Sequence, residues 1–222
     1  MVARELKLLV AFTILFVTVS VAQRPNYRIR NYIGIQGGVS QFDIITDNFE
    51  TEQSNGWTAG LFAMVNVPHK WYDFSYGINF SDNKVDIFGK NAALSNEIQP
   101  MEYKLSTVQL MILMHAKIFK ENLVIDFGPS FQANGKLELQ DDNQDNYYIA
   151  GFDNLQATDI EEISKFNVNG VIGAAAGFRN FRFRVQYQYG FTNMLRKLDD
   201  LDVNTKFKGN HSQLAFTAMV LF

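Results

Sequence analysis

Residues 72–81 alternate strictly between apolar and polar or small side chains, and this pattern limits the fold of the chain more than any short motif does. The apolar set comprises Tyr72, Phe74, Tyr76, Ile78 and Phe80. The polar or small set comprises Asp73, Ser75, Gly77, Asn79 and Ser81. Because successive side chains of a strand point to opposite faces, the segment predicts a β-strand with one apolar and one polar face.

The same alternation recurs along the chain. We predict eight strands, at about residues 31–41, 56–67, 71–82, 104–118, 122–135, 166–178, 181–191 and 211–222. Short links (68–70, 119–121 and 179–180) alternate with long polar links (42–55, 83–103, 136–165 and 192–210). Tight turns at one rim and loops at the other are typical of an up-and-down barrel. The predicted fold class is all-β, an eight-stranded antiparallel up-and-down barrel.

The first 22 residues have the pattern of a secretory signal peptide. Arg4 and Lys7 form a basic region, residues 8–21 form an apolar core, and Ser20-Val21-Ala22 is a small-residue cleavage site. An uncleaved anchor is the alternative, but the apolar core is short and lacks a charged stop-transfer flank. We therefore expect a signal peptide at 1–22 and a barrel domain at 23–222. The chain has no cysteine, so it offers neither a lipoprotein attachment site nor a disulfide framework.

Alternation alone does not decide which face of the barrel points inward. A soluble barrel would enclose the apolar set, whereas a membrane barrel turns it toward lipid. A strand of about eleven residues, tilted by about 40°, spans roughly 28 Å, close to the apolar band of an outer-membrane barrel. Aromatic residues make up 14% of the chain and gather near the predicted strand ends, as in an interfacial girdle. Both observations favour a transmembrane β-barrel.

Several segments resemble one family. Tyr189-Gly190-Phe191-Thr192-Asn193-Met194 is similar to a Tyr-Gly-Leu-Thr-Asn-Ile signature at the end of the penultimate strand of small outer-membrane β-barrels called porin-like or PorT-like. Gly128-Pro129, the run from Gly170 to Gly177 and the ending from Ser212 to Phe222 are similar as well, whereas Val108-Gln109-Leu110-Met111 lacks an expected proline. The resemblance implies an integral protein of a Gram-negative outer membrane. One branch of the family is associated with a protein secretion system.

A barrel of eight strands has a lumen that side chains nearly fill. Counted from the short turns, Asp73, Asp126, Arg182 and Arg184 lie at similar heights on the polar face. Because buried charges must be paired and an arginine fork suits a carboxylate, we predict an ion-pair cluster that plugs the lumen. A narrow ion or solute pore is the alternative.

The long links are the expected sites of specific interaction, because loops on a rigid scaffold carry binding. Link 136–165 holds eight carboxylates against two lysines, a charge that argues against nucleic acid as a partner. Asp141, Asn143 and Asp145 have the spacing that opens a calcium loop, but Asn146 and Phe152 occupy the positions of its glycine and glutamate. We therefore expect a solvated acidic loop and leave calcium binding open.

Two further expectations concern these links. A short helix at about 158–166 would place Ile160 and Ile163 on one side, over the barrel mouth or against a partner. Four cationic residues of the last link could contact lipopolysaccharide phosphates or remain solvated, namely Arg196, Lys197, Lys206 and Lys208.

Catalysis is not indicated by the sequence. The three histidines are His69 in a short turn, His115 on the lumen face and His211, which precedes Ser212. Adjacent strand residues face opposite ways, so His211 and Ser212 cannot form a nucleophile–base pair. We expect no catalytic, metal or cofactor site. The predicted protein is a monomeric barrel that acts through its surface loops, with a secretion-system component as the alternative function.

Overall fold

The computed structural model describes residues 29–93, 95, 97–178, 180–201 and 205–222. The predicted signal peptide at 1–22 therefore lies outside the described residues. The described part contains β1 (Arg30–Thr46), β2 (Thr51–Asn66), β3 (Tyr72–Lys90), β4 (Ile98–Phe119), β5 (Leu123–Leu139), β6 (Tyr148–Ile149), β7 (Phe166–Gly177), β8 (Phe181–Gly190) and β9 (Gly209–Leu221). It also contains three 3₁₀ helices, η1 (Asp142–Gln144), η2 (Ala157–Glu161) and η3 (Arg196–Asp200).

Eight of these strands form a closed antiparallel ring, which confirms the predicted fold class. The order around the ring is β2-β1-β9-β8-β7-β5-β4-β3, and pairing of β2 with β3 closes it. The first and last strands meet through pairs such as Gly34 with Leu221. The two-residue strand β6 adds to the far end of β3. Closure leaves no long strand edge unpaired, as a β-structure in lipid requires.

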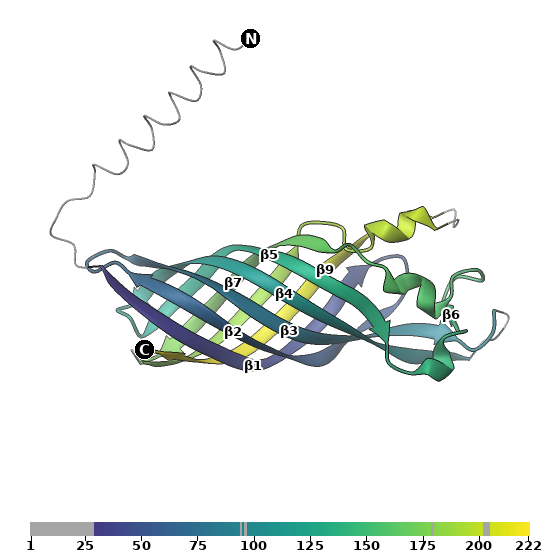
Figure 1. Ribbon diagram of the computed structural model, residues 1–222, viewed down its shortest axis with the longest axis horizontal. Helices are drawn as coiled ribbons and strands as arrows, with labels where there is room; N and C mark the ends of the chain where they lie inside the picture. Colours follow the sequence, from purple (N-terminus) through teal and green to yellow (C-terminus); the bar gives the residue numbers. More distant parts are fainter. Residues whose placement is uncertain (1–28, 94, 96, 179, 202–204) are drawn as a thin grey trace, which may run out of the picture.

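The two rims of the barrel differ, as Figure 1 shows. Three short turns, which join β2 to β3, β4 to β5 and β7 to β8, lie at the rim near the C-terminus; we call this end the turn rim. The other end carries all three 3₁₀ helices and the remaining links between strands of the ring, and we call it the loop rim.

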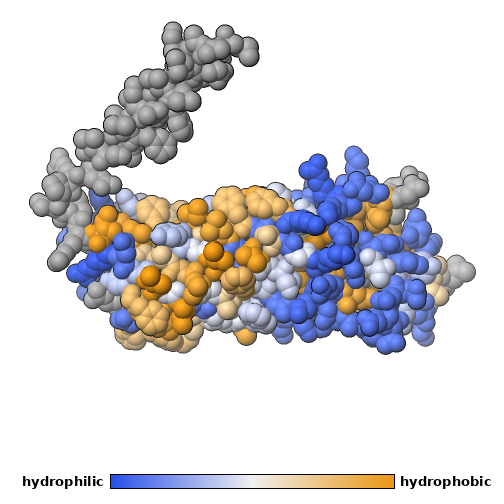
Figure 2. All heavy atoms as spheres, in the orientation of Figure 1, coloured by the Kyte–Doolittle hydropathy of each residue, from blue (hydrophilic) through white to orange (hydrophobic). Residues whose placement is uncertain are grey.

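The barrel is apolar outside and polar inside over the half near the turn rim. Outward residues such as Ile33 and Phe183 are 68% and 64% exposed, whereas Gln109, His115 and Asp126 inside are fully buried. Figure 2 shows apolar side chains gathered over this half and hydrophilic ones over the other. This is the opposite of a water-soluble barrel, and it matches a lipid-facing exterior.

Near the loop rim the strands continue beyond the predicted ends, and their two faces exchange character. On β3, Lys84 and Asp86 point outward, while Val85 and Ile87 are fully buried. Links 42–55 and 83–103 were therefore wrongly predicted as loops, because most of their residues lie in β1 to β4. The prediction failed because it assumed that a strand keeps the same apolar face along its whole length. The outward apolar face ends where the strand leaves the apolar belt. Beyond it, water surrounds the barrel and the apolar side turns inward.

Two β-bulges lie at the level of this exchange. The pairing of β2 with β3 shifts between Gln53 and Trp57. The pairing of β4 with β5 shifts between Leu105 and Thr107, which pair with Leu137 and Asn134. The extra residue in β5 brings the odd-numbered Leu137 inward, although the lumen residues nearer the turn rim have even numbers. A bulge thus breaks the alternation that is visible in the sequence.

The inward apolar residues of the extended strands join loop residues in one buried group, which we call the cap cluster. It consists of Phe42, Ile44, Phe49, Val85, Ile87, Met101, Tyr103, Leu105, Leu137, Ile149, Leu155, Ala157, Ile160, Ile163, Met194, Leu195, Leu198 and Phe207. The predicted short helix is present as η2, one residue earlier and shorter, and Ile160 and Ile163 are both buried in this group. The long links are therefore folded over the loop rim.

Candidate functional site

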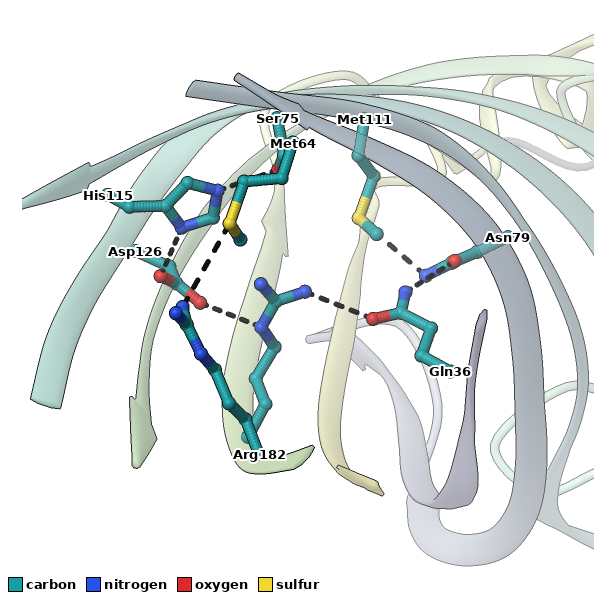
Figure 3. Close-up of polar contacts among 9 residues, drawn as sticks. Gln36, Met64, Ser75, Asn79, Met111, His115, Asp126 and Arg182 are labelled. Atoms are coloured by element: carbon teal, nitrogen blue, oxygen red, sulfur yellow. Dashed lines mark hydrogen bonds and ion pairs between the residues drawn. The ribbon is translucent and has the colours of Figure 1, made fainter. Parts of the chain in front are cut away.

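The candidate site is a chain of polar contacts that crosses the lumen near the turn rim. We call it the lumen network, and it consists of Gln36, Ser75, Asn79, His115, Asp126 and Arg184, all of which are buried. They come from β1, β3, β4, β5 and β8, so the network joins strands from around the ring (Figure 3). Each residue occupies an inward position set by the alternation of its strand.

Asp126 is the centre of this network. Its Oδ1 lies 2.6 Å from His115 Nδ1, and its Oδ2 lies 2.8 Å from Arg184 Nε. Arg184 Nη1 donates to Gln36 Oε1 at 3.0 Å, and Gln36 Nε2 donates to Asn79 Oδ1 at 2.6 Å. An isolated charge in such a place is costly, and these contacts offset the loss of hydration. This continuous path of contacts crosses the lumen at this level.

The structure brings together two of the four residues predicted to form the ion-pair cluster, Asp126 and Arg184. Arg182 lies next to them in Figure 3, where its Nη1 contacts Met64 Sδ at 4.0 Å. Among the described residues Arg182 forms no ion pair, and its Nε has no hydrogen-bond partner. Arg182 is therefore a buried cation beside the pair rather than a member of it.

Asp73, the fourth predicted residue, forms a separate cluster at the turn rim. Its Oδ1 lies 2.8 Å from Lys117 Nζ and accepts from the Val67 amide at 2.8 Å. Its Oδ2 accepts from Asn66 Nδ2 at 3.0 Å. This carboxylate thus fixes the turn between β2 and β3 to β4.

The sequence prediction omitted Lys117 as the partner of Asp73 and did not pair His115 with Asp126. A signal was present, because the short turn between β4 and β5 places His115 directly opposite Asp126 in the ladder. Lys117 shares the face of His115, two residues nearer the same turn. The distinction between Arg182 and Arg184 has no equivalent signal, since both lie on the same face of β8.

A second layer of amides fills the lumen farther from the turn rim. Gln109 Nε2 donates to Gln132 Oε1 at 2.9 Å, and Gln188 Nε2 donates to Gln109 Oε1 at 3.2 Å. Asn169 Nδ2 donates to Gln132 Oε1 at 2.7 Å. These four side chains are almost completely buried. Together with the lumen network and the cap cluster they occupy the barrel interior at successive levels.

Ser75, His115 and Asp126 have the connectivity of a nucleophile, a base and an orienting carboxylate. Ser75 Oγ lies 2.7 Å from His115 Nε2, while His115 Nδ1 contacts Asp126. However, only 4% of Ser75 is exposed, and Arg184 also contacts the carboxylate of Asp126. An acyl substrate would have to reach a serine inside a filled barrel. The geometry is therefore that of a hydrogen-bonded side chain that fills the lumen.

The hexapeptide from Tyr189 to Met194 leads the chain from the barrel wall onto the cap. Thr192 Oγ1 accepts from Asn167 Nδ2 at 2.7 Å and from the Val168 amide at 3.1 Å. Asn193 Oδ1 accepts from the amides of Leu195 and Gly209 at 3.0 and 2.9 Å. Met194 is fully buried in the cap cluster. These residues thus have structural roles at the end of β8.

The acidic link offers no metal site among the residues that the structure describes, because they include no group of three metal-binding side chains. Asp141 Oδ1 accepts from the amide and the side chain of Asn143, so it caps η1. Glu162 lies between two lysines, 3.0 Å from Lys136 Nζ and 3.1 Å from Lys197 Nζ. Hydrogen bonds from both lysines lower the pKa of Glu162.

Contact of the four cationic residues with lipopolysaccharide remains a prediction. Lys197 is engaged by Glu162, whereas Arg196, Lys206 and Lys208 are exposed. The side chain of Asn48 binds the backbone of Lys206 and Lys208, which holds this segment to the loop after β1.

A closed ring of eight antiparallel strands, with an apolar exterior and a polar interior, defines the class of outer-membrane β-barrels. Comparison with family models agrees with this class, since residues 21–196 match the model described as outer membrane protein beta-barrel domain. The chain therefore belongs to this family of bacterial outer-membrane proteins.

The chain is also similar to solved structures. Neisserial surface protein A is 10% identical with a TM-score of 0.50, and the alignment covers 87% of this chain and 99% of that one. Ail, the attachment invasion locus protein of Yersinia pestis, is 13% identical with a TM-score of 0.45, and the alignment covers 87% and 99% of the two chains. No curated protein matches the sequence. At such low identity the likeness concerns the fold alone.

Proposed function

We propose that the protein is a closed barrel that presents a folded cap at the cell surface and acts through that surface as a structural or interaction protein. The observation that carries this proposal is that buried side chains occupy the lumen near both of its ends. The lumen network crosses the barrel near the turn rim, and the cap cluster seals the loop rim. A barrel filled in this way supports binding at its surface better than passage through its centre.

The orientation in the membrane follows the usual arrangement of such barrels, with short turns in the periplasm and longer segments outside. The cap then faces the medium, next to outer-leaflet lipid and lipopolysaccharide. Export uses a signal peptide cleaved after Ala22, and the protein remains a monomer. Nucleic acid is not a partner, because the surface segment 136–165 is strongly acidic.

Conductance across a planar bilayer tests closure directly. The purified protein should give no steady channel, because charged and amide side chains fill the lumen. Removing the centre of the network with Asp126→Ala should produce brief openings, while Arg182→Met serves as a control that leaves the pair intact. Steady channels from the unmodified protein would overturn the closed barrel and favour a narrow pore.

A secretion-system component is the alternative role, since the resemblance to PorT-like proteins implies it. Affinity capture from cross-linked outer membranes separates the two roles. Stoichiometric periplasmic or membrane partners bound at the turn rim would favour the secretion role. Partners that depend on the cap would support the surface role.

We also propose that the barrel is not an enzyme, despite the Ser75–His115–Asp126 connectivity. A fluorophosphonate probe labels activated serines, and we expect no label on Ser75 in the folded protein because its hydroxyl is buried. Labelling that disappears in both Ser75→Ala and His115→Ala variants, with the fold retained, would contradict this proposal.

A further inference from the structure

Three segments that carry the family resemblance meet at one place on the outer surface of the barrel. These are Gly128-Pro129 on β5, the start of the glycine run at Gly170 on β7, and Tyr189-Gly190-Phe191 at the end of β8. Pro129 pairs with Gly170, and Gly170 pairs with Tyr189, so the three strands bring them side by side. The proposed surface role involves the cap and the lumen, whereas this place lies on the lipid-facing wall.

The convergence forms a groove of about 500 Å³, which we call the motif groove. It is lined by Phe127, Gly128, Pro129, Gly170, Val171, Ile172, Tyr187, Tyr189 and Phe191. The groove exists because small or compact residues lie between aromatic walls. A side chain at Gly170 would collide with the ring of Phe191, since a Cβ atom there would lie 2.5 Å from Phe191 Cζ.

The position of the groove limits what can occupy it. Ile172, Tyr187 and Phe191 are 58%, 39% and 69% exposed on the outward face of the barrel. They belong to the apolar belt, where the surroundings are lipid acyl chains rather than water. The Tyr187 hydroxyl lies 3.2 Å from Ser212 Oγ, so this polar group already has a partner on β9. Apart from the Tyr189 hydroxyl the lining is apolar, so it offers mainly shape and dispersion contacts.

We propose that the motif groove holds one acyl chain of a membrane lipid, in preference to the convex, ungrooved parts of the lipid-facing surface. In lipid there is no hydrophobic gain from burying apolar groups, so association depends on close packing. A concave surface contacts a chain on several sides, whereas a convex barrel wall contacts it on one. The continuity of the groove with the lipid-facing belt makes a lipid chain its occupant, rather than a soluble ligand.

The test uses vesicles of phosphatidylethanolamine in which a small fraction of the lipid carries a diazirine on one acyl chain. After illumination, mass spectrometry of peptides shows where the lipid has reacted. We expect the peptides that contain Phe127 to Pro129, Gly170 to Ile172 and Tyr187 to Phe191 to carry more label than belt peptides that line no groove. Label spread evenly around the belt would overturn the proposal.

A pair of variants separates groove binding from general lipid contact. Ile172→Trp fills the groove and should lower labelling of its peptides about threefold, through loss of dispersion contacts. Ile35→Trp is the matched control, since Ile35 is also an outward isoleucine, on β1, and is 47% exposed. Equal labelling in both variants would refute a defined site. A photo-crosslinker at position 172 that captures a protein in intact outer membranes, instead of lipid, would likewise overturn the lipid assignment.

Discussion

Asp126 contacts two potential cations at once, and this makes it the most consequential single side chain of the lumen. Its two oxygens are divided between His115 and Arg184, so the loss of either partner leaves part of a buried charge without compensation. Arg182 lies two residues before Arg184 on the same face of β8 and is equally buried, but among the described residues only Arg184 forms a direct ion pair with Asp126. Two neighbouring arginines on one strand therefore have different energetic roles.

We predict that Arg184→Ala lowers the free energy of unfolding by about 3–5 kcal/mol, because it leaves the Asp126 carboxylate buried with one partner. Arg182→Met should change it by less than about 1 kcal/mol, since the pair survives and the lumen stays filled. Urea unfolding of the protein in lipid vesicles measures both. Equal losses in the two variants would show that the arginines share the carboxylate.

At the scale of elements, the strands have two segments with opposite amphipathic character. Within the belt a strand is apolar outside, and beyond it the same strand is apolar inside, as β3 shows between Asn79 and Ile87. The outer segments could not stand alone, because their inward apolar faces need a cover. The links that contain η2 and η3 supply it, with Ile160 and Leu198 buried against the strands. The outer strand segments and the docked links are therefore stable only together.

Tyr103 on β4 tests this coupling. Its side chain is fully buried in the cap cluster, and its hydroxyl donates to the Ala157 carbonyl at 3.0 Å. Tyr103→Ala should destabilise the cap by about 3–5 kcal/mol through the cavity it leaves, and Tyr103→Phe by about 1 kcal/mol through the lost hydrogen bond. Limited proteolysis of link 140–165 should accelerate strongly in the first variant and slightly in the second. An unchanged cleavage rate in Tyr103→Ala would mean that the link is not held by the cap cluster.

Docking of η2 should also depend on pH through Glu162. Its pKa in the folded protein is lowered from the ordinary value of 4.5 by hydrogen bonds from Lys136 and Lys197. A lowered carboxylate pKa contributes stability that is present above pH 4.5 and is lost as pH falls through the folded pKa. We expect amide hydrogen exchange in 157–163, corrected for its intrinsic pH dependence, to show loss of protection below that pH. Glu162→Gln should remove this step, and a step that persists in the variant would assign it to another group.

At the scale of the whole molecule, the barrel is a closed membrane cylinder with a water-exposed extension. The ring of eight strands pairs the backbone groups within the belt, and the cap covers the loop rim. The lumen and the cap are two different interiors, one polar and one apolar, stacked along the same axis. This arrangement accounts for strands such as β4, which has 22 residues.

The closed ring predicts heat-modifiable migration. In electrophoresis of isolated outer membranes without boiling, the protein should migrate as a compact species, because the paired ring resists detergent. Boiling should shift it to the position of an unfolded 25 kDa chain or slightly below it if the signal peptide has been removed. A soluble periplasmic pool without such a shift would contradict membrane insertion.

Much of this architecture could be predicted because period-two alternation is a local property of the sequence. Residues 72–81 carry both faces of a strand within ten positions, and the lengths of the links indicate which rim each end occupies. The same alternation correctly placed Asp126 and Arg184 on the lumen face at similar heights. Strand number, the polar lumen and the outward apolar belt thus followed from neighbouring residues and the geometry of the strand.

Only the tertiary structure decided how inward residues pair and where the apolar face of a strand switches from the outside of the barrel to the inside. Arg182 and Arg184 are equivalent in sequence, but only Arg184 reaches Asp126 across the lumen. The cap joins Phe42, Tyr103, Ile160 and Phe207 from distant parts of the chain, and all four lie in links that the alternation left outside the predicted strands. Which face is apolar depends on whether lipid or water surrounds the strand. The surroundings of each residue depend on its position along the barrel axis, and not on its neighbours in the chain.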